Sequence, residues 1–415
     1  MSSSYPVSFY IRIFVPFALG YFISYLFRVI NAVIAGDLSH DLSINAEQLG
    51  LLTSAYLITF AAFQFPLGIL LDKFGPRRVE ATLLLVSAVG ALIFAYSQSF
   101  AGLMFGRSLI GLGVSACLMG AFKALVQWFP SERLPLANGI LLTSGGIGIL
   151  MGSTPVEWAL TFTDWRGIFV GLSAFTALVA ATLWLAVPDK HSDADQSSWW
   201  TQIFSILAIL KDRRFWCLTP LSTACQGTAI ATIGLWTGPW LRDVALLGRS
   251  EAAWILLFLG AGILSGFLLT GWVAQVLLKK GISTMTTACM GMAMFIVVQI
   301  LIVAEWTAFS LYLWIAYGLF STSGMLTYAV LSQSYPKELA GRVNTCFNAL
   351  VFFFAFAAQW GIGAIIEKFT PQNFDPVRYH GDGYQVAFGF LVLLQIICLI
   401  AFALKGRRTL THSPT

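Results

Sequence analysis

Long apolar runs separated by short polar segments recur along the whole chain of 415 residues. Each run lasts roughly 20 to 25 residues, the length that an α-helix needs to cross the hydrocarbon core of a bilayer. The first run, from Phe9 to Ile34, is too long for the core of a cleavable signal peptide and is expected to be a span. The pattern predicts spans at residues 9–35, 49–71, 79–98, 101–127, 136–160, 166–187, 215–241, 251–277, 285–303, 308–334, 343–366 and 384–404.

Composition and charge support a membrane protein and exclude an ordinary soluble one. Charged residues make up only 10% of the chain, whereas they make up roughly a quarter of a soluble domain. Of the 24 Lys and Arg residues, 15 lie in loops on the side that holds both termini, 5 on the other side and 4 within spans. By the positive-inside rule the richer side is cytoplasmic. We therefore expect a multi-pass protein of the cytoplasmic (inner) membrane with both termini in the cytoplasm.

A repeat divides the chain into two halves. At one constant offset, close to half the chain length, Gln127, Pro130, Glu132 and Asn138 recur as Gln333, Pro336, Glu338 and Asn344. The predicted domains are an N-terminal six-helix bundle (1–187), a polar cytoplasmic linker (188–214) and a C-terminal six-helix bundle with a short cytoplasmic tail (215–415). The predicted fold class is thus all-α, with twelve transmembrane helices in two pseudo-symmetric bundles, an arrangement that points to a transporter.

The loop after the second predicted span carries a specific motif. Its glycines, acid and paired bases follow in the order Gly68, Asp72, Gly75, Arg77 and Arg78. Glycines permit a tight turn there, and the bases can pair with a carboxylate. The motif resembles the signature loop of the major facilitator superfamily, and this resemblance extends over essentially the whole chain. It implies a cytoplasmic latch between the halves; a simple positive-inside anchor is the competing interpretation.

Two further features fit the same family. Arg107 in the fourth span matches the family's Arg and Gly pattern and is interpreted as a coupling or structural residue buried between helices. In the fifth span, Gly145, Gly148 and Gly152 share one side of the helix. Such a seam of small residues lets two helices approach closely and pivot, although simple close packing would produce the same pattern.

Arg28 is the strongest candidate for binding an anionic solute. An ionised side chain at mid-span costs roughly 2.5 to 3.5 kcal/mol, so it needs a partner, a wet cavity or a route to the interface. Tyr21, Tyr25, Arg28 and Asn31 fall on one side of the first helix, and the family resemblance implies that this helix lines the central cavity. An Arg fork binds a carboxylate or a phosphate bidentately. The family resemblance implies that phosphate-ester carriers bind their substrate with two Arg residues, one of them in the seventh span. The seventh span here has no Arg, so a carboxylate is favoured; a structural or snorkelling Arg is the competing interpretation.

Other candidates are weaker. Gln226 and Trp240 of the seventh span and Tyr328 of the tenth are expected to line the solute path, as helices one, four, seven and ten do in the family. Lys123 in the fourth span either binds an anion or snorkels to the cytoplasmic interface. Glu157 in the fifth span is the candidate proton carrier, and a charge partner near the outer face is its alternative role.

The sequence therefore predicts a secondary transporter that moves a small anionic organic solute, a carboxylate, by alternating access, with import favoured. It resembles the organic-anion and carboxylate symporter branch of the superfamily. Alternatives are a neutral amino acid or peptide carrier, an exporter of amphipathic compounds and, from another class, a polytopic membrane enzyme or receptor. Expected partners are the solute, the lipid bilayer and a co-transported proton or other ion. No cofactor, metal or nucleic acid is expected, and the functional unit is expected to be a monomer.

Overall fold

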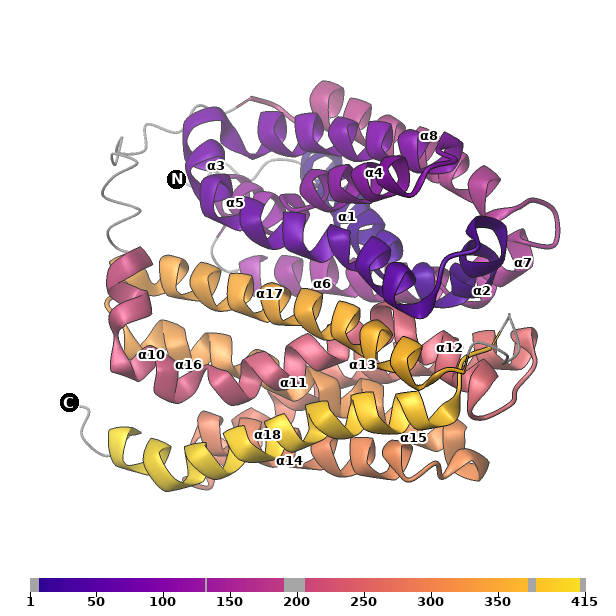
Figure 1. Ribbon diagram of the computed structural model, residues 1–415. Coiled ribbons are helices and arrows are strands. Elements are labelled where there is room, and N and C mark those ends of the chain that lie inside the picture. The colour runs from indigo at the N-terminus through magenta and orange to yellow at the C-terminus, as the bar shows by residue number, and fades with distance from the viewer. Residues whose placement is uncertain (1–6, 131–132, 190–205, 372–377, 411–415) are drawn as a thin grey trace. The chain divides into compact units, whose positions relative to one another are not determined.

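The computed structural model describes residues 7–130, 133–189, 206–371 and 378–410. Every regular element in these ranges is a helix (Figure 1), which confirms the predicted all-α class. Parts of two predictions, residues 190–205 of the linker and 411–415 of the tail, lie outside the described ranges, as does Glu132 of the repeat. The described helices include nine that are long and apolar enough to cross a membrane.

The first half of the chain is built from α1 (Val7–Val29), α2 (Asn31–Leu42), α3 (Ala46–Tyr96), α4 (Phe100–Gly113), α5 (Cys117–Trp128), α6 (Leu134–Met151), α7 (Thr154–Ala159) and α8 (Trp165–Ala186). α3 joins two predicted spans across Gly75, whose φ of 78° and ψ of 158° are not helical. Only glycine adopts this combination without strain. The tight turn expected in the motif loop is therefore located at Gly75.

We expect Gly75→Ala to lower the free energy of unfolding by about 1 to 3 kcal/mol, because the new side chain forces a strained backbone conformation. The measurement is thermal unfolding of the purified protein in detergent. Gly171→Ala in α8 is the matched control, since a Cβ there meets nothing within 4 Å. Equal melting temperatures for the two variants would show that Gly75 is not needed for the turn.

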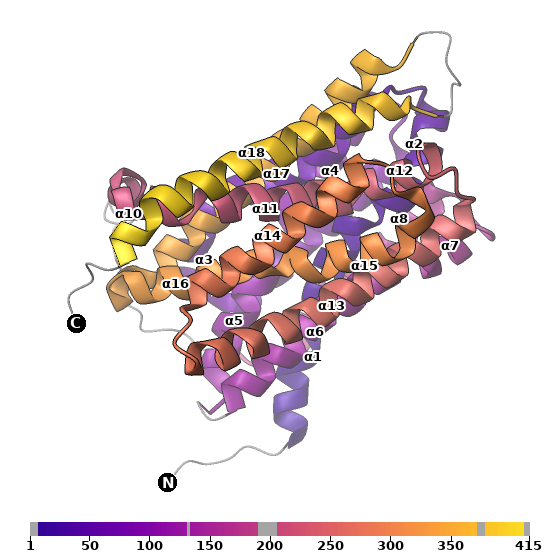
Figure 2. The ribbon, with the colours of Figure 1, turned by 90° about the horizontal axis from the view of Figure 1, so that it is seen from below.

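The second half contains α10 (Arg213–Leu218), α11 (Pro220–Ala231), the π-helix η2 (Thr232–Trp236), α12 (Thr237–Asp243), α13 (Arg249–Lys279), α14 (Thr284–Val303), the 3₁₀ helix η3 (Thr307–Phe309), α15 (Ser310–Ser321), the 3₁₀ helix η4 (Thr322–Met325), α16 (Leu326–Ser334), α17 (Lys337–Phe369) and α18 (Gly381–Leu410). α15 packs between α13 and α14, as Figure 2 shows. The predicted spans 136–160 and 215–241 correspond to series of shorter helices, so the count of twelve spans stays a prediction.

The chain divides into two compact units. Unit 1 comprises Met1–Asp37 and Ala55–Gln196, and unit 2 comprises Leu38–Ser54 and Ser197–Thr415. The later boundary falls within the predicted linker. The segment Leu38–Ser54 groups with unit 2. The predicted N-terminal bundle (1–187) contains this segment.

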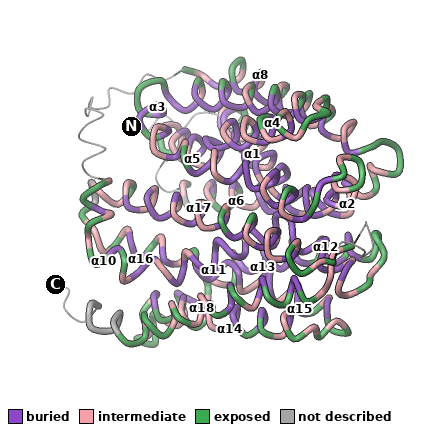
Figure 3. The backbone as a smooth tube through the Cα atoms, in the orientation of Figure 1, coloured by how far each residue is buried: buried purple, intermediate pink, exposed green. Residues whose placement is uncertain are grey.

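Exposed apolar side chains recur along the helices. On α18 they follow at helical spacing as Phe390, Leu393, Ile397, Ile400 and Leu404, with Phe390 59% and Leu404 72% exposed. Figure 3 shows that exposed positions recur along α18. Such a stripe is unfavourable in water but matches the hydrocarbon of a bilayer. The chain is therefore a multi-pass protein embedded in a membrane.

Candidate functional site

The first predicted span is two helices rather than one. α1 ends at Val29 and α2 begins at Asn31, with Ile30 in the turn between them. The N–H of Ile30 still donates to the carbonyl of Leu26 at 3.1 Å, so the interruption is local. It falls two residues after Arg28. The last turn of a helix stabilises a positive charge through its unpaired carbonyls, which suits a cation at this position.

The guanidinium of Arg28 lies against aromatic side chains of unit 1. Its Cζ atom is 4.5 Å from the ring centroid of Tyr25 and 5.5 Å from that of Phe60, and Tyr56 is a hydrogen-bonding partner. The rings of Tyr21 and Tyr25 meet edge to face at 5.1 Å. We name Tyr21, Tyr25, Arg28, Tyr56 and Phe60 the Arg28 cluster. Ring faces stabilise a cation without neutralising its charge.

Tyr56 connects the Arg28 cluster to Arg107. Its hydroxyl donates to the carbonyl of Ser24 at 3.1 Å, and the guanidinium of Arg107 lies 5.4 Å from its ring centroid. Arg107 is fully buried and donates to the carbonyl of Phe27 at 3.2 Å. It therefore supports the backbone next to Arg28. The burial of Arg107 agrees with the expectation that it is buried between helices. Its role in coupling stays a prediction.

The α6 glycines pack against α1, close to the Arg28 cluster. A Cβ at Gly145 would lie 2.5 Å from the Cε1 atom of Tyr21, and one at Gly148 would overlap the backbone carbonyl of Phe22. Gly152 continues the same contact one turn later. The seam thus brings α6 against the helix that carries Arg28. Pivoting about this seam stays a prediction.

Lys123 on α5 forms an ion pair with Asp72 of the motif loop. The sequence analysis did not foresee this contact, which gives the ammonium a fixed anionic neighbour. An alternative role of Lys123 as a ligand for the solute stays a prediction. Asp72 is more than half exposed, so the pair contributes little to stability by itself.

The paired bases of the motif loop reach the end of α8. Arg77 donates to the carbonyl of Trp184 at 2.6 Å, and Arg78 forms an ion pair with Asp189. The expectation that one of these bases meets a carboxylate is met by Arg78. Within unit 1 the loop is therefore tied to α5 on one side and to the end of α8 on the other. Its function as a latch stays a prediction.

Two further predicted residues of unit 1 lie on α2 and α7. Asn31 begins α2 and is only 1% exposed. Glu157 is half-buried in the short helix α7. Their roles in solute binding and proton coupling stay predictions.

The predicted site residues of unit 2 belong to separate contacts. Gln226 is buried on α11. Trp240 of α12 meets Trp314 edge to face at 5.4 Å between centroids, and the hydroxyl of Tyr328 donates to Asn348 Oδ1 at 2.8 Å. The structure does not gather the three into one cluster comparable to that around Arg28. Their participation in binding stays a prediction.

The sequence analysis missed a polar network beside the π-helix η2. The side-chain amides of Gln299 and Gln395 exchange hydrogen bonds of 2.9 and 3.0 Å, and Gln395 also donates to Thr228 Oγ1 at 3.4 Å. Gln299 and Thr228 border a cavity that Thr232 and Tyr317 also line. The sequence feature that could have revealed this network is the presence of two glutamines within otherwise apolar spans. π-Helical turns often mark functional positions, so this network is a second polar centre inside unit 2.

Helix α17 holds the start of α3 within unit 2. Gln359 Nε2 donates to Thr53 Oγ1 at 2.7 Å, and the N–H of Ala46 donates to Glu367 Oε2 at 3.1 Å. The helices approach so closely that a Cβ at Gly50 would lie 2.9 Å from the carbonyl oxygen of Gln359. These contacts explain why Leu38–Ser54 groups with the second half of the chain.

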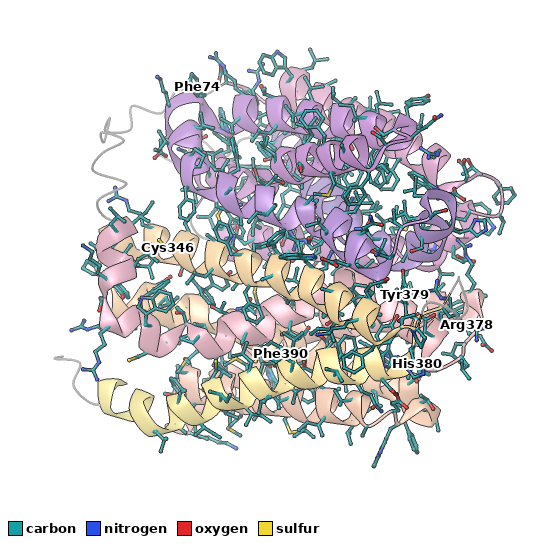
Figure 4. All side chains as sticks on the ribbon, in the orientation of Figure 1. Phe74, Cys346, Arg378, Tyr379, His380 and Phe390 are labelled. Atoms are coloured by element: carbon teal, nitrogen blue, oxygen red, sulfur yellow. The ribbon has the colours of Figure 1, made fainter. Side chains whose placement is uncertain are left out.

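A buried carboxylate supports the same end of unit 2. Asp243 accepts from Arg242 Nε and from the hydroxyl of Tyr384, both at 2.7 Å. The nearby hydroxyl of Tyr379 lies 3.1 Å from Ser39 Oγ, and Figure 4 shows Tyr379 just before α18. Burial raises the pKa of the Tyr379 hydroxyl, which therefore stays neutral at physiological pH. Ser39 is thus attached to the network around Asp243.

We expect Gln359→Leu to increase hydrogen–deuterium exchange of the backbone amides of residues 46–54. The substitution removes the partner of the buried Thr53 hydroxyl and loosens the contact between α3 and α17. Gln333→Leu is the matched control, because the side chain of Gln333 on α16 is exposed. If exchange at 46–54 is the same in both variants, Gln359 does not anchor the segment.

Comparison with known proteins defines the class to which this fold belongs. The chain matches the family model described as Major Facilitator Superfamily over residues 17–359. It therefore belongs to the major facilitator superfamily, as its motif loop predicted. Its relatives and structural neighbours are transporters, not enzymes.

Three relatives of this chain are named as transporters of organic acids. It is 30% identical to a probable sulfoacetate transporter of Cupriavidus necator over 42% of this chain and 41% of the relative. It is 26% identical to the hexuronate transporter of Escherichia coli K12 over 60% and 62% of the two chains. A probable galactarate/D-glucarate transporter of Bacillus subtilis is 24% identical over 90% and 89%. The first two matches thus span less than two thirds of those relatives.

Solved structures share the fold. A bacterial homologue of the human lysosomal transporter Spinster has a TM-score of 0.78 at 16% identity, with all of both chains covered. The nucleoside transporter NupG has a TM-score of 0.74 at 14% identity, covering 94% of this chain and 99% of that one. At these identities the likeness establishes the architecture alone.

Proposed function

We propose that this protein is a secondary transporter of small organic acid anions, of the acid-sugar or sulfoacetate kind, and that Arg28 binds their carboxylate. The observation that carries the proposal is the Arg28 cluster: a guanidinium at the interrupted end of a membrane helix, surrounded by aromatic rings. A guanidinium fork matches a carboxylate bidentately, and an aromatic ring offers an apolar face to the carbon skeleton beside it. The acid substrates named for the relatives contain both parts.

The same proposal assigns roles to the surrounding contacts. Transport would proceed by alternating access, with import in the cytoplasmic membrane and both termini in the cytoplasm. α1 moves against the α6 seam, while the pairs Asp72–Lys123 and Arg78–Asp189 form and break with the motif loop. Exposed ion pairs suit this task, since each is worth little and opens at low cost. The functional unit proposed is a monomer with a co-transported cation.

A screen of matched ligands by thermal unfolding tests the proposal. A ligand that binds only the folded protein raises its melting temperature as its concentration exceeds the dissociation constant. Galacturonate, glucarate and sulfoacetate are expected to stabilise the purified protein, whereas galactose, which lacks the carboxylate, is not. Stabilisation by neutral amino acids, dipeptides or amphipathic cations instead of these acids would contradict the proposed substrate class.

A further inference from the structure

Glu80 is a carboxyl group inside unit 1 that none of the contacts above uses. It lies on α3 five residues after Gly75 and is completely buried. Neither of its carboxyl oxygens has a hydrogen-bond partner among the residues that the structure describes. Buried carboxylates are normally paired, because an isolated charge in an apolar interior is very costly. The neutral acid is the form that this environment accommodates.

Two glycines form a slot for this carboxyl group. A Cβ at Gly20 of α1 would lie 2.5 Å from Glu80 Oε1, and a Cβ at Gly120 of α5 would lie 2.5 Å from Glu80 Oε2. Any other residue at either position would displace the side chain. The carboxyl group therefore fits between two helix backbones, and α1 and α5 must separate before water can reach it.

The charged groups around this slot already have other partners. On α5, Lys123 pairs with Asp72 of the motif loop. On α3 itself, Arg77 and Arg78 reach the end of α8. Among the described residues, the thiol of Cys117 on α5 is within electrostatic range of both Glu80 and Arg28, and on α1 Tyr21 and Tyr25 lie beside Arg28.

Glu80 and Arg28 both lie within electrostatic range of the Cys117 thiol. Glu80 contacts α1 at Gly20, eight residues before Arg28, which corresponds to about 12 Å of helix. Two unit charges at about this distance in a medium of effective dielectric about 20 change each other's binding equilibria about tenfold. An anion on Arg28 cancels the positive charge that favours ionised Glu80. Anion binding therefore strengthens proton binding at Glu80, and the reverse also holds.

We propose that Glu80 is a proton-binding site that couples proton movement to the transport of the anion; this rests on the proposed transport function. In the step, a hydronium ion transfers one proton to the Glu80 carboxylate, which forms an O–H bond and leaves a water molecule. The neutral side chain then enters the slot between Gly20 and Gly120. When α1 and α5 separate in the state that opens to the opposite side of the membrane, the proton returns to water.

Transport in proteoliposomes of phosphatidylethanolamine and phosphatidylglycerol separates coupling from translocation. Galacturonate counterflow needs no proton gradient. Accumulation of galacturonate requires one, which vesicles at pH 8 inside and pH 6 outside provide. Glu80→Gln is expected to keep counterflow within about twofold of wild type, because Gln imitates the neutral acid, and to lose gradient-driven accumulation completely. Glu251→Gln, an exposed helix-cap residue, is the matched control and is expected to accumulate like wild type.

Accumulation by Glu80→Gln at the wild-type level overturns the proposal. If Glu157→Gln loses accumulation while Glu80→Gln retains it, the proton carrier is Glu157 instead. Absence of acid counterflow in the wild type contradicts the transport function, and a second measurement then still decides the role of Glu80.

That second measurement is thermal unfolding between pH 5 and pH 8 in detergent. An unfolded chain releases the Glu80 proton above pH of about 4.3, whereas the folded protein retains it, so rising pH lowers the melting temperature of the wild type. Glu80→Gln removes this contribution, so its melting temperature is expected to fall less between pH 5 and pH 8 than that of the wild type. Equal pH slopes overturn the proposal. If Glu80→Gln does not fold, Glu80→Met, neutral and of similar length, replaces it in both measurements.

Discussion

Replacing Arg28 with alanine is expected to weaken the apparent affinity for galacturonate at least about 100-fold. Hydrogen bonds to charged groups contribute roughly 1.5 to 3 kcal/mol each, and a bidentate carboxylate forms two of them, so this loss is a conservative expectation. Arg28→Lys retains the charge but not the planar fork and is expected to fall between alanine and wild type. The measurement is the concentration dependence of counterflow in proteoliposomes.

Arg12→Ala is the matched control for this experiment, because Arg12 lies exposed on the same helix. It is expected to leave the affinity within about twofold of wild type, as surface substitutions usually do. Unchanged affinity in Arg28→Ala, with normal amounts of folded protein, would remove Arg28 from the binding site.

The second large effect is expected at Gly148. A methyl group there meets the carbonyl of Phe22 on α1, and a backbone atom cannot rotate away as a side chain does. Overpacking of this kind costs about 1 to 3 kcal/mol. Gly148→Ala is therefore expected to lower both the melting temperature and the counterflow rate, and Gly148→Val is expected to lower them further.

Gly139→Ala on the same helix separates a packing effect from a general loss of flexibility. A Cβ at Gly139 meets nothing within 4 Å, so this variant is expected to be as stable as wild type or slightly more stable. If Gly148→Ala transports at the wild-type rate, the close approach of α6 to α1 is not required for function.

The sequence predicted the helices well because the lipid environment imposes a simple pattern on them. Apolar runs of sufficient length gave the spans, and the glycine of the motif loop gave the turn that the structure has at Gly75. The interruption after Arg28 and the π-helix at Thr232–Trp236 were not predicted. Both are local departures of the backbone that depend on contacts with other helices, which hydrophobic periodicity does not encode.

Contacts between distant parts of the sequence were the second limit. A helical wheel places Lys123 on one face of its own helix, but it carries no information about Asp72, with which Lys123 pairs. The segment Leu38–Ser54 joins unit 2 through Gln359 and Glu367, more than 300 positions later in the chain. Pattern analysis of a single sequence cannot detect pairings of this kind.

Glu80 illustrates a different error. The sequence analysis did not select it, although it follows the bases Arg77 and Arg78 closely. Its helical phase was the signal that could have identified it, because Glu80 shares one buried face with Leu84, Ser87 and Ala91. A charged residue in phase with the buried face of a membrane helix is a functional candidate even near the end of the span.

Counterflow of galacturonate compared with galactose into proteoliposomes tests the central claim, the transport of organic acid anions through the Arg28 cluster, most directly. The two sugars differ only in the carboxylate that Arg28 is proposed to bind. The account predicts that radiolabelled galacturonate enters vesicles preloaded with unlabelled galacturonate and that galactose does not enter vesicles preloaded with galactose. Equal entry of the two sugars, or entry of galactose alone, would contradict it.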